Sequence, residues 1–384
     1  MLSISKIISG RNETGDHLRY RRWEGPVRPV VVWNSTRACN LKCKHCYASA
    51  RLKPGEGELS TVEGRQLIDD LAAFRVPVIL FSGGEPLMRP DFFELANLAR
   101  EKGIRPTVST NGTLITREVA WRLKETGVGY AGISIDGMRE TNDRMRGYDG
   151  AFEAAIEGVR HCVAVGQRVG LRFTITRDNY REIDAIFDLV ESEGIDRVCF
   201  YHLVYSGRGS QLIEQDLNPA EKRAVVDRIY ERTADFCRRG LNKEILTVDN
   251  HADVVYTFLK LKDTESEKAD LVWQWLQNAG GNRSGVAIGC VDWHGDVHPD
   301  QFTMNHTLGN VRERKFGEIW EDRSHPIMAG LKDRKPLLHG RCAACRWLSI
   351  CNGNFRPRAE AVTGDFWAPD PACYLTDEEI GLNS

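Results

Sequence analysis

The sequence lacks the features that would mark a membrane, secreted or nucleic-acid-binding protein. It has no apolar run long enough to span a bilayer, and its first twenty residues contain neither a long apolar core nor a small-residue cleavage site. Its 52 Lys and Arg nearly balance its 54 Asp and Glu, so no excess of positive charge indicates a nucleic acid. We therefore expect a cytoplasmic protein with no membrane and no nucleic acid among its partners.

Cysteine, in contrast, is abundant, with 11 residues in a chain of 384. Eight of the cysteines lie in or near two regions, residues 39–46 and 290–373. In a chain without a secretory signal, clustered cysteines argue for metal or redox chemistry rather than for disulfides. Cys162, Cys199 and Cys237 are isolated in apolar or helical stretches, and we expect them to be buried packing residues.

Cys39, Cys43 and Cys46 form a C-x3-C-x2-C pattern directly after the apolar run at residues 30–33. Three thiolates on one short loop can hold three corners of a cubane iron–sulfur cluster and leave the fourth iron open to a small molecule. A structural zinc loop is the alternative, but zinc prefers four closed ligands and no fourth cysteine follows nearby. His45 lies between two of the cysteines and is expected to point away.

Short β-branched runs alternate with segments of helical period along residues 30–280. Such alternation predicts parallel βαβ units with right-handed crossovers, and therefore an α/β fold. Ser60 and Glu63 form a capping-box pattern at the first helix. The predicted strands are 30–34, 77–82, 105–109, 130–135, 169–175, 197–203 and a further one at 245–248; the predicted helices are 60–73, 91–102, 116–126, 150–166, 179–193, 218–239 and 251–278.

Polar motifs follow these strands where each strand ends. The segment 81–86, Phe-Ser-Gly-Gly-Glu-Pro, ends the second strand, 109–113 ends the third and 134–137 ends the fourth. The carboxyl ends of parallel strands meet at one end of a barrel, where chemistry is usually located. The two glycines permit a close approach of the backbone, and Glu85 offers a carboxylate to a cation. Turn formation explains Asn-Gly and Asp-Gly equally well.

The cysteine pattern, followed by Tyr47, and the Gly-Gly-Glu-Pro element one βα unit later together resemble the radical SAM superfamily. This resemblance implies a partial (β/α)6 barrel and a [4Fe–4S] cluster on Cys39, Cys43 and Cys46 whose open iron chelates S-adenosylmethionine. It implies that the reduced cluster passes an electron to S-adenosylmethionine and that the resulting 5′-deoxyadenosyl radical takes a hydrogen from the substrate. The implied cofactor-binding residues are Gly83, Gly84, Glu85, Asn111, Ser134 and Asp136.

A second cysteine set lies near the end of the chain, at Cys342, Cys345, Cys351 and Cys373. Four soft ligands can close another cubane cluster completely, and a zinc ion would also accept them. The pattern resembles the SPASM-type extension of radical SAM maturases, although a full extension has more cysteines. We therefore expect one auxiliary [4Fe–4S] cluster, with Cys290 spare, near the substrate or a substitute ligand. The predicted domains are 1–28, a lead-in over the barrel end; 29–280, the radical SAM core; and 281–384, a small Cys-rich SPASM-like domain.

Within this superfamily, residues 205–209, 248–253, 280–282 and 340–374 resemble the enzymes that modify sirohaem-derived tetrapyrroles. The resemblance implies a haem-biosynthetic enzyme that removes two acetate side chains from 12,18-didecarboxysirohaem to give Fe-coproporphyrin III, with an external electron donor. Conversion of propionates on the way to haem d1 and modification of a peptide are the alternative activities. A non-catalytic iron–sulfur or zinc protein is the remaining alternative, but it would not need the Gly-Gly-Glu-Pro element.

An iron tetrapyrrole with several carboxylates needs cationic partners and apolar cover. His251 could be a base or an iron ligand, although helix capping is the commoner role for the polar residues beside it. His298 and His306 could also meet the metallated ring. The predicted cations are Arg172, Arg208 and His202, of which Arg208 and His202 are the catalytic candidates; the predicted cover is Tyr201, Tyr205, Trp293 and Phe302.

Overall fold

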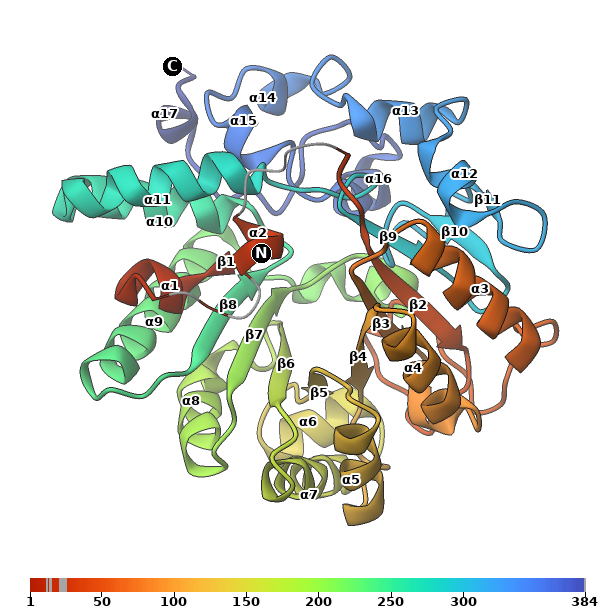
Figure 1. Ribbon diagram of the computed structural model, residues 1–384. Helices are drawn as coiled ribbons and strands as arrows, with labels where there is room; N and C mark the ends of the chain where they lie inside the picture. The colour runs from red at the N-terminus through yellow and green to blue at the C-terminus, as the bar shows by residue number, and fades with distance from the viewer. Residues whose placement is uncertain (12, 14–15, 21–25, 383–384) are drawn as a thin grey trace.

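The computed structural model describes residues 1–11, 13, 16–20 and 26–382 (Figure 1). In this described chain one sheet has the strand order β1-β8-β7-β6-β5-β4-β3-β2-β9-β10-β11. Strands β2 to β8 are neighbours in sequence order and pair in parallel, and β9 adds a further parallel strand beside β2. The order has two free ends, so the barrel is open. The predicted α/β fold with a partial barrel is confirmed.

The strands are β1 (Leu2–Ser3), β2 (Val30–Thr36), β3 (Val78–Gly83), β4 (Arg105–Thr110), β5 (Ala131–Ser134), β6 (Val169–Ile175), β7 (Arg197–His202), β8 (Glu244–Val248), β9 (Ile288–Val291), β10 (Asp296–His298) and β11 (Gly309–Asn310). The barrel helices are α3 (Thr61–Ala73), α4 (Phe92–Glu101), α5 (Arg117–Glu125), α6 (Arg139–Arg146), α7 (Ala151–Ala164), α8 (Ile183–Ser192) and α9 (Pro219–Arg238). The remaining α-helices are α1 (Ile4–Ser9), α2 (Asp16–Arg19), α10 (Ala252–Thr264), α11 (Ser266–Ala279), α12 (Phe316–Glu321), α13 (Pro326–Lys332), α14 (Gly340–Ala343), α15 (Leu348–Cys351), α16 (Arg356–Thr363) and α17 (Asp377–Ile380).

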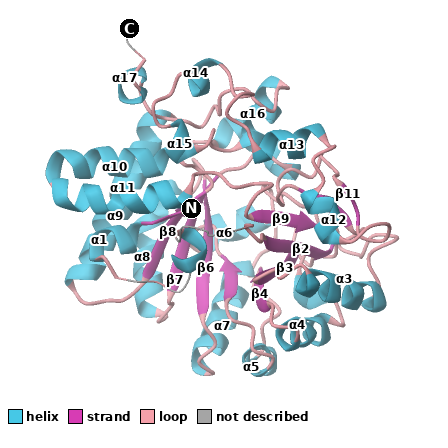
Figure 2. Cartoon of the chain, turned by 45° about the horizontal axis from the view of Figure 1, so that its top comes forward, coloured by secondary structure: helices cyan, strands magenta, loops and turns pink. Residues whose placement is uncertain are grey.

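Alternate residues of the parallel strands face opposite sides of the sheet, as the pleat requires. Trp33 and Phe81 face outward, where their ring centroids lie 5.5 Å apart, and Phe81 contacts Phe92 of α4 at 5.3 Å. Val32 and Leu80, each one residue earlier, face the barrel interior instead. Figure 2 shows the consequence, with strands in the centre and helices around them. The apolar core therefore lies between sheet and helices, and the interior of the barrel is left for a ligand.

The predicted helix at 251–278 is wrong in one respect, because it is two helices. The chain breaks at Glu265, whose φ of −144° and ψ of 70° are not helical, so α10 and α11 form an antiparallel pair. The domain boundary expected near residue 280 coincides with the end of α11 at Gly280, which has a left-handed φ of 66°. The capping box predicted at Ser60 and Glu63 is present at α3.

The C-terminal region packs on the carboxyl ends of the barrel strands through a buried arginine. Arg358 on α16 pairs with Asp370 at 2.9 Å, and neither side chain is exposed to solvent. The same guanidinium donates to the carbonyl oxygens of Asp249 at 2.6 Å, after β8, and of Leu203 at 3.2 Å, after β7. These bonds fix the residues that follow two barrel strands.

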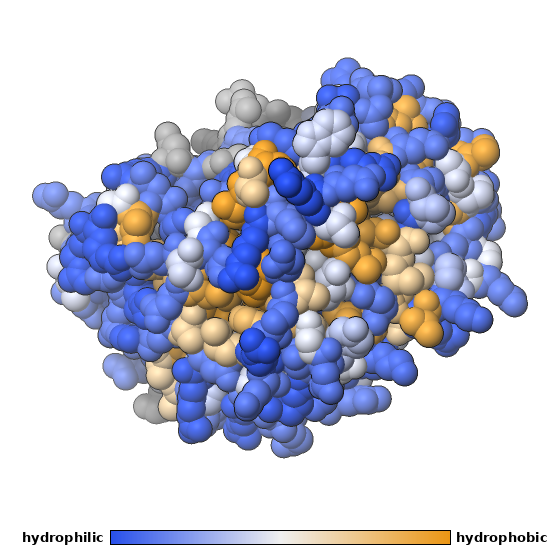
Figure 3. All heavy atoms as spheres, turned by 90° about the horizontal axis from the view of Figure 1, so that it is seen from below, coloured by the Kyte–Doolittle hydropathy of each residue, from blue (hydrophilic) through white to orange (hydrophobic). Residues whose placement is uncertain are grey.

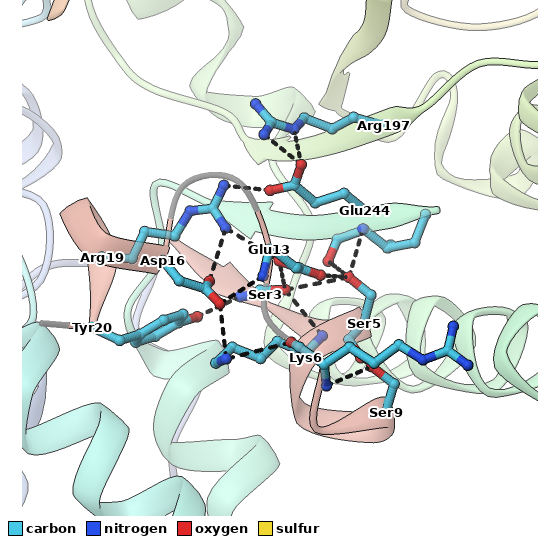
Figure 4. Close-up of polar contacts among 12 residues, drawn as sticks. Ser3, Ser5, Lys6, Ser9, Glu13, Asp16, Arg19, Tyr20, Arg197 and Glu244 are labelled. Carbon is cyan, nitrogen blue, oxygen red and sulfur yellow. Dashed lines mark hydrogen bonds and ion pairs between the residues drawn. The ribbon is translucent and has the colours of Figure 1, made fainter. Parts of the chain in front are cut away.

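Of the first twenty residues, the described ones (1–11, 13 and 16–20) lie along the edge strand rather than over the barrel end. Strand β1 pairs antiparallel with β8. At the start of β8, Glu244 accepts hydrogen bonds from Arg19 at 2.6 Å and from Arg197 at 2.7 Å (Figure 4). Arg168 donates to the same carboxylate at 2.6 Å. Burial opposes ionisation of Glu244, but Arg197 and Arg19 outweigh it and lower its pKa. Residues 1–11, 13 and 16–20 of the predicted lead-in are thus tied to one edge of the open barrel, whereas Arg28 pairs with Glu321 of α12.

Polar residues form most of the rim of the face shown in Figure 3, with apolar residues in its middle. None of the helices in the described residues has the length and apolarity to cross a membrane.

Candidate active site

The loop after β2 brings the first three cysteines to one cavity. Cys39 and Cys43 are buried and pack with Leu41 and Ala50, and Cys46 lies against this group. All three cysteines line a cavity of about 140 Å³ at the carboxyl ends of the strands. Of the predicted cofactor and substrate residues, the following also line it: Gly83, Gly84, Asn111, Ser134, Arg172, Tyr201, His202, Arg208 and Phe302.

Gly83 and Gly84 let the cysteine loop pack directly on the end of β3. A Cβ on Gly84 would lie 2.0 Å from the carbonyl oxygen of Ala38, and one on Gly83 would lie 2.5 Å from that of Thr36. The amide of Gly84 donates to Thr36 and that of Glu85 to Ala38, each at 2.7 Å. No side chain fits between loop and strand, so the glycines are required by this contact as well as by the approach to a ligand.

Glu85 lies behind the cavity wall rather than in it. Its carboxylate accepts hydrogen bonds from the amide of Asn111 at 2.7 Å, the hydroxyl of Thr110 at 2.8 Å and the amide of Leu87 at 3.1 Å. Burial nevertheless raises the pKa of Glu85 to about 6. No cation of the described chain contacts this carboxylate, so the ammonium group of an amino-acid ligand nearby would stabilise its charged form. Asn111 is held in the wall by a 2.8 Å bond to Asn40.

Asp136 is also buried and does not line the cavity. Its carboxylate pairs with Arg146 and with Nε2 of His45 at 3.1 Å, and it accepts the amide of Thr174 at 2.7 Å. Burial opposes its ionisation, but Arg146 and His45 outweigh burial and lower the pKa of Asp136 to about 2. Arg146 in turn donates to Sγ of Cys43 at 3.6 Å. Direct cofactor contact by Asp136 is therefore not supported; it positions Arg146, and His45 faces the cavity instead of pointing away.

Arg208 holds the cysteine loop from the opposite side. Its Nε donates to the carbonyl oxygen of Cys43 at 2.9 Å and its Nη1 to that of Ala50 at 3.0 Å. Nη2 is buried without a hydrogen-bond partner among the described residues. Two of the three guanidinium nitrogens therefore bind the protein's own loop, and the contact of Arg208 with substrate stays a prediction.

His202 is enclosed by protein contacts. Its Nε2 lies 2.9 Å from Asp253, whose second carboxylate oxygen accepts the hydroxyl of Tyr374 at 2.9 Å. His202 is only 2% exposed and Asp253 is fully buried. This chain of bonds joins β7, α10 and the C-terminal region, so His202 serves first to hold the cavity wall; its contact with substrate stays a prediction.

A larger cavity of about 380 Å³ adjoins the first one in the gap of the open barrel. Arg172, Tyr201, Asp249 and Phe302 line both cavities. Arg172 and Thr174 face the interior together, as the alternation of β6 predicts. The guanidinium of Arg172 lies 4.6 Å over the ring of Tyr201 and makes no hydrogen bond or ion pair with the described residues.

Four other predicted substrate contacts lie away from both cavities. Tyr205 donates to Asp216 at 2.6 Å instead, and Trp293 is buried among the residues that follow β9. His298 is buried and bonds the carbonyl oxygen of His306 at 3.0 Å. His306 pairs with a glutamate of α16 at 2.8 Å. These side chains stabilise the fold, and the predictions that they meet the substrate are not supported.

The C-terminal cysteines also converge. A cavity of about 260 Å³ is lined by Cys342, Cys345, Cys351 and Cys373. Cys290 does not line it; this residue is buried on β9, where Asn34 Nδ2 lies 3.5 Å from its Sγ. Its position argues against a substitute ligand and places it between β2 and β10.

Both cysteine sets fit iron–sulfur clusters. The described residues contain free thiols only, and among them no three His, Cys, Asp or Glu side chains are arranged to hold a single metal ion. Thiols that surround a cavity without meeting at one point fit a polynuclear cluster better than a zinc ion. Burial raises the pKa of Cys39 to about 12, so its thiolate needs a bound cation.

Two cavity residues were missed from the sequence. Arg146 ends α6 next to Cys43, and no local pattern distinguishes it from the other basic residues of that helix. Arg283 follows the Gly-Gly-Asn segment and lines the larger cavity, half-buried, and its guanidinium makes no hydrogen bond or ion pair in the described chain. Burial lowers the pKa of Arg283. In the sequence, the Gly-Gly-Asn segment contributes only to the resemblance to tetrapyrrole-modifying enzymes.

Comparison with known proteins agrees with this geometry. The family model of the radical SAM superfamily matches residues 33–190, and that of an iron–sulfur cluster-binding domain, SPASM, matches residues 288–346. The chain is 56% identical to the Fe-coproporphyrin III synthase of Methanosarcina barkeri, over 99% of each chain. It is 43% identical to the pre-heme d1 synthase of Dinoroseobacter shibae, over 93% of this chain and 89% of that one.

Solved structures share the fold. Streptococcus suis SuiB bound to its precursor peptide superposes with a TM-score of 0.72 at 19% identity, covering 91% of this chain and 76% of that one. The enzyme anSMEcpe with bound AdoMet superposes with a TM-score of 0.70, also at 19% identity, covering 93% of each chain. At such identities the likeness concerns the fold alone.

Proposed function

This chain belongs to the radical SAM superfamily and carries a C-terminal iron–sulfur cluster-binding domain, and from this premise we propose that it is a Fe-coproporphyrin III synthase. The observation that carries the proposal is the 56% identity to such a synthase along almost the whole of both chains. The lower identity of 43% to a pre-heme d1 synthase favours the loss of two acetate side chains from 12,18-didecarboxysirohaem over a change in its propionates.

The first cavity has the residues for the cofactor chemistry. Bound by Cys39, Cys43 and Cys46, a [4Fe–4S] cluster supplies the electron that cleaves S-adenosylmethionine, and an external donor must first deliver that electron. The walls then position the nucleoside and the amino acid. Asn111 and Ser134 offer polar groups at the cavity surface, and the buried carboxylate behind Asn111 favours a cation in front of it.

The larger cavity has the charge that a tetrapyrrole with several carboxylates needs. Its apolar walls include Val32 and Leu80, which suit a flat macrocycle. Several arginines line it, and two of them, Arg172 and Arg283, have neither a side-chain hydrogen bond nor an ion pair in the described chain. An unpaired guanidinium in a partly apolar cavity strongly favours a carboxylate. Since this cavity adjoins the cluster site, a peripheral side chain of the macrocycle can reach the radical.

The test is an anaerobic incubation of the reconstituted enzyme with dithionite, S-adenosylmethionine and 12,18-didecarboxysirohaem, followed by mass spectrometry. We expect 5′-deoxyadenosine and a product that has lost two acetate groups. Cys39→Ala should abolish both, whereas Cys237→Ala, on α9 and outside the cavities described here, should retain them. A mass change that corresponds to altered propionates, or 5′-deoxyadenosine without any change in the tetrapyrrole, would reject the assignment.

A further inference from the structure

His251 is the only histidine among the described residues that line the larger cavity. It lies three residues after the end of β8 and is the N-cap residue of α10. Its amide donates to Asn354 Oδ1 at 2.7 Å, and the same amide group of Asn354 donates to Asn250 Oδ1 at 2.8 Å. Asn250 also donates to the carbonyl oxygen of Ala372 at 3.0 Å. The C-terminal region therefore holds the backbone of His251 and the side chain of its neighbour Asn250, and His251 lines the cavity.

The imidazole of His251 is buried without an ion pair in the described chain. The residue is 7% exposed, and its Nδ1 has no hydrogen-bond partner in the described chain. His202 and His306, in contrast, each pair with a carboxylate at 2.9 Å and 2.8 Å. Burial lowers the pKa of His251 well below its usual value, so the ring is neutral. A neutral imidazole with a free nitrogen is the form that binds metals.

The groups around His251 identify the kind of metal complex. Arg172 and Arg283 line the same cavity without ion pairs, so the site favours a ligand with negative charge at its edge. The apolar walls favour a flat, uncharged body. No further His, Cys, Asp or Glu group in the described chain forms a metal site there, which excludes a bare ion held by several side chains. An iron tetrapyrrole fits, because its ring supplies four ligands and leaves an axial position open.

We propose that His251 is the axial ligand to the iron of the tetrapyrrole substrate, and that Arg283 binds a carboxylate of the same molecule. The inference rests on the proposed function, which provides the iron tetrapyrrole. It extends that function by naming how the macrocycle is placed: iron bound at the β8 end of the cavity and a carboxylate bound at residue 283. These two contacts orient the ring relative to the cluster cavity, so that one side chain is presented for reaction.

The experiment compares Fe(III)-coproporphyrin III with metal-free coproporphyrin III as probes on the reconstituted full-length protein. Binding is followed by the Soret band, and the iron by electron paramagnetic resonance. His251→Ala should weaken binding of the iron probe on the order of tenfold or more and change the spectrum of this probe. Binding of the metal-free probe should be unchanged. Added imidazole should restore the spectrum. Arg283→Met is the matched cavity variant and should weaken the binding of both probes equally, without a change in their spectra.

Other results of this experiment would reject either the axial ligand or the proposed function. An unchanged spectrum and affinity of the iron probe in His251→Ala would reject the axial ligand while the proposed function stands. Equal weakening of both probes by His251→Ala would mean a structural role and would also reject it. Binding of neither probe by the wild type would reject the proposed function itself. If His251→Ala does not fold, His251→Met keeps a ligand of similar size and should shift the spectrum rather than abolish coordination.

Discussion

Arg146→Met tests whether the buried pair beside the first cluster holds the site together. Arg146 contacts two groups, the carboxylate of Asp136 and Sγ of Cys43. The substitution removes the charge but retains an apolar stem of similar length. It therefore leaves Asp136, which is fully buried, without its main cation. We expect a less stable protein and a cysteine loop that holds its cluster less well.

The size of the expected loss in the free energy of unfolding follows from two independent arguments. Removal of one partner of a buried ion pair costs about 3–5 kcal/mol, and the remaining contacts of Asp136 with His45 and Thr174 favour the lower end. A pKa of Asp136 lowered from 3.8 to about 2 corresponds to about 2 kcal/mol of stability at pH 7. This contribution is complete above pH 3.8 and is lost as the pH falls through about 2. The expected loss at pH 7 is about 3 kcal/mol.

The assay is anaerobic urea unfolding of the cluster-free protein, followed by tryptophan fluorescence. With an m-value of about 3 kcal/mol/M, the midpoint should fall by about 1 M. The double variant with Asp136→Asn removes the stranded charge and should recover about 2 kcal/mol of the loss. Arg160→Met is the control, since its pair with Glu193 is exposed and should contribute less than about 1 kcal/mol.

Two results would refute the reasoning. One is a cost of Arg146→Met no larger than that of Arg160→Met. The other is a double variant that is as unstable as Arg146→Met, because the loss would then not come from the buried charge of Asp136. Iron analysis after reconstitution adds a functional reading, since Arg146→Met should lower the occupancy of the barrel cluster and spare the C-terminal one.

Other predictions follow from the same site and from the edge of the barrel. Gly84→Ala places a methyl group 2.0 Å from the carbonyl oxygen of Ala38, so the protein should lose about four of the eight irons expected for two cubane clusters. Gly55→Ala is the control, because its nearest contact is at 3.6 Å and it should lose no iron. Equal iron contents of the two variants would contradict this prediction. Burial raises the pKa of Glu85 from 4.5 to about 6, so this group destabilises the cluster-free fold by about 2 kcal/mol as the pH rises through that interval. Glu85→Gln should remove this pH dependence of the free energy of unfolding, measured from unfolding curves recorded between pH 4 and 8. Glu244→Gln leaves its three arginine partners without a counter-charge and should lower the free energy of unfolding by about 3 kcal/mol. A midpoint in urea equal to that of the wild type would show that the arginines are already solvated.

Local structural features could be predicted from the sequence because each depends on a short or periodic pattern of residues. The alternation of β-branched runs with helical segments predicted the parallel strands, and the interval between Ser60 and Glu63 predicted a capping box that is present. The residues 251–278 show the limit of this approach. Their helical period is continuous, yet packing against the C-terminal region turns the chain at Glu265, which the period alone does not encode.

Side-chain partners could not be read from the sequence in the same way. Asp136 and Glu85 have the right chemistry for a ligand, but the fold buries both and supplies Arg146 and Asn111 as their partners. A carboxylate pairs with whichever donor lies nearest in space, and that donor comes from another βα unit. Sequence spacing therefore predicted that these residues lie at the ends of the strands, but it could not supply their protein partners.

The sequence by itself determined that this protein has two sets of clustered thiols and an α/β barrel with polar groups at its strand ends, because those features depend on spacing and period within short segments. Only the tertiary structure decided that the barrel stays open between β8 and β9, and that the gap holds His251 and Arg283 in one cavity beside Arg172. These residues are far apart in the chain and share no motif. Their common function depends on the curvature of the sheet, which brings its two edges together around a space that no single segment encloses.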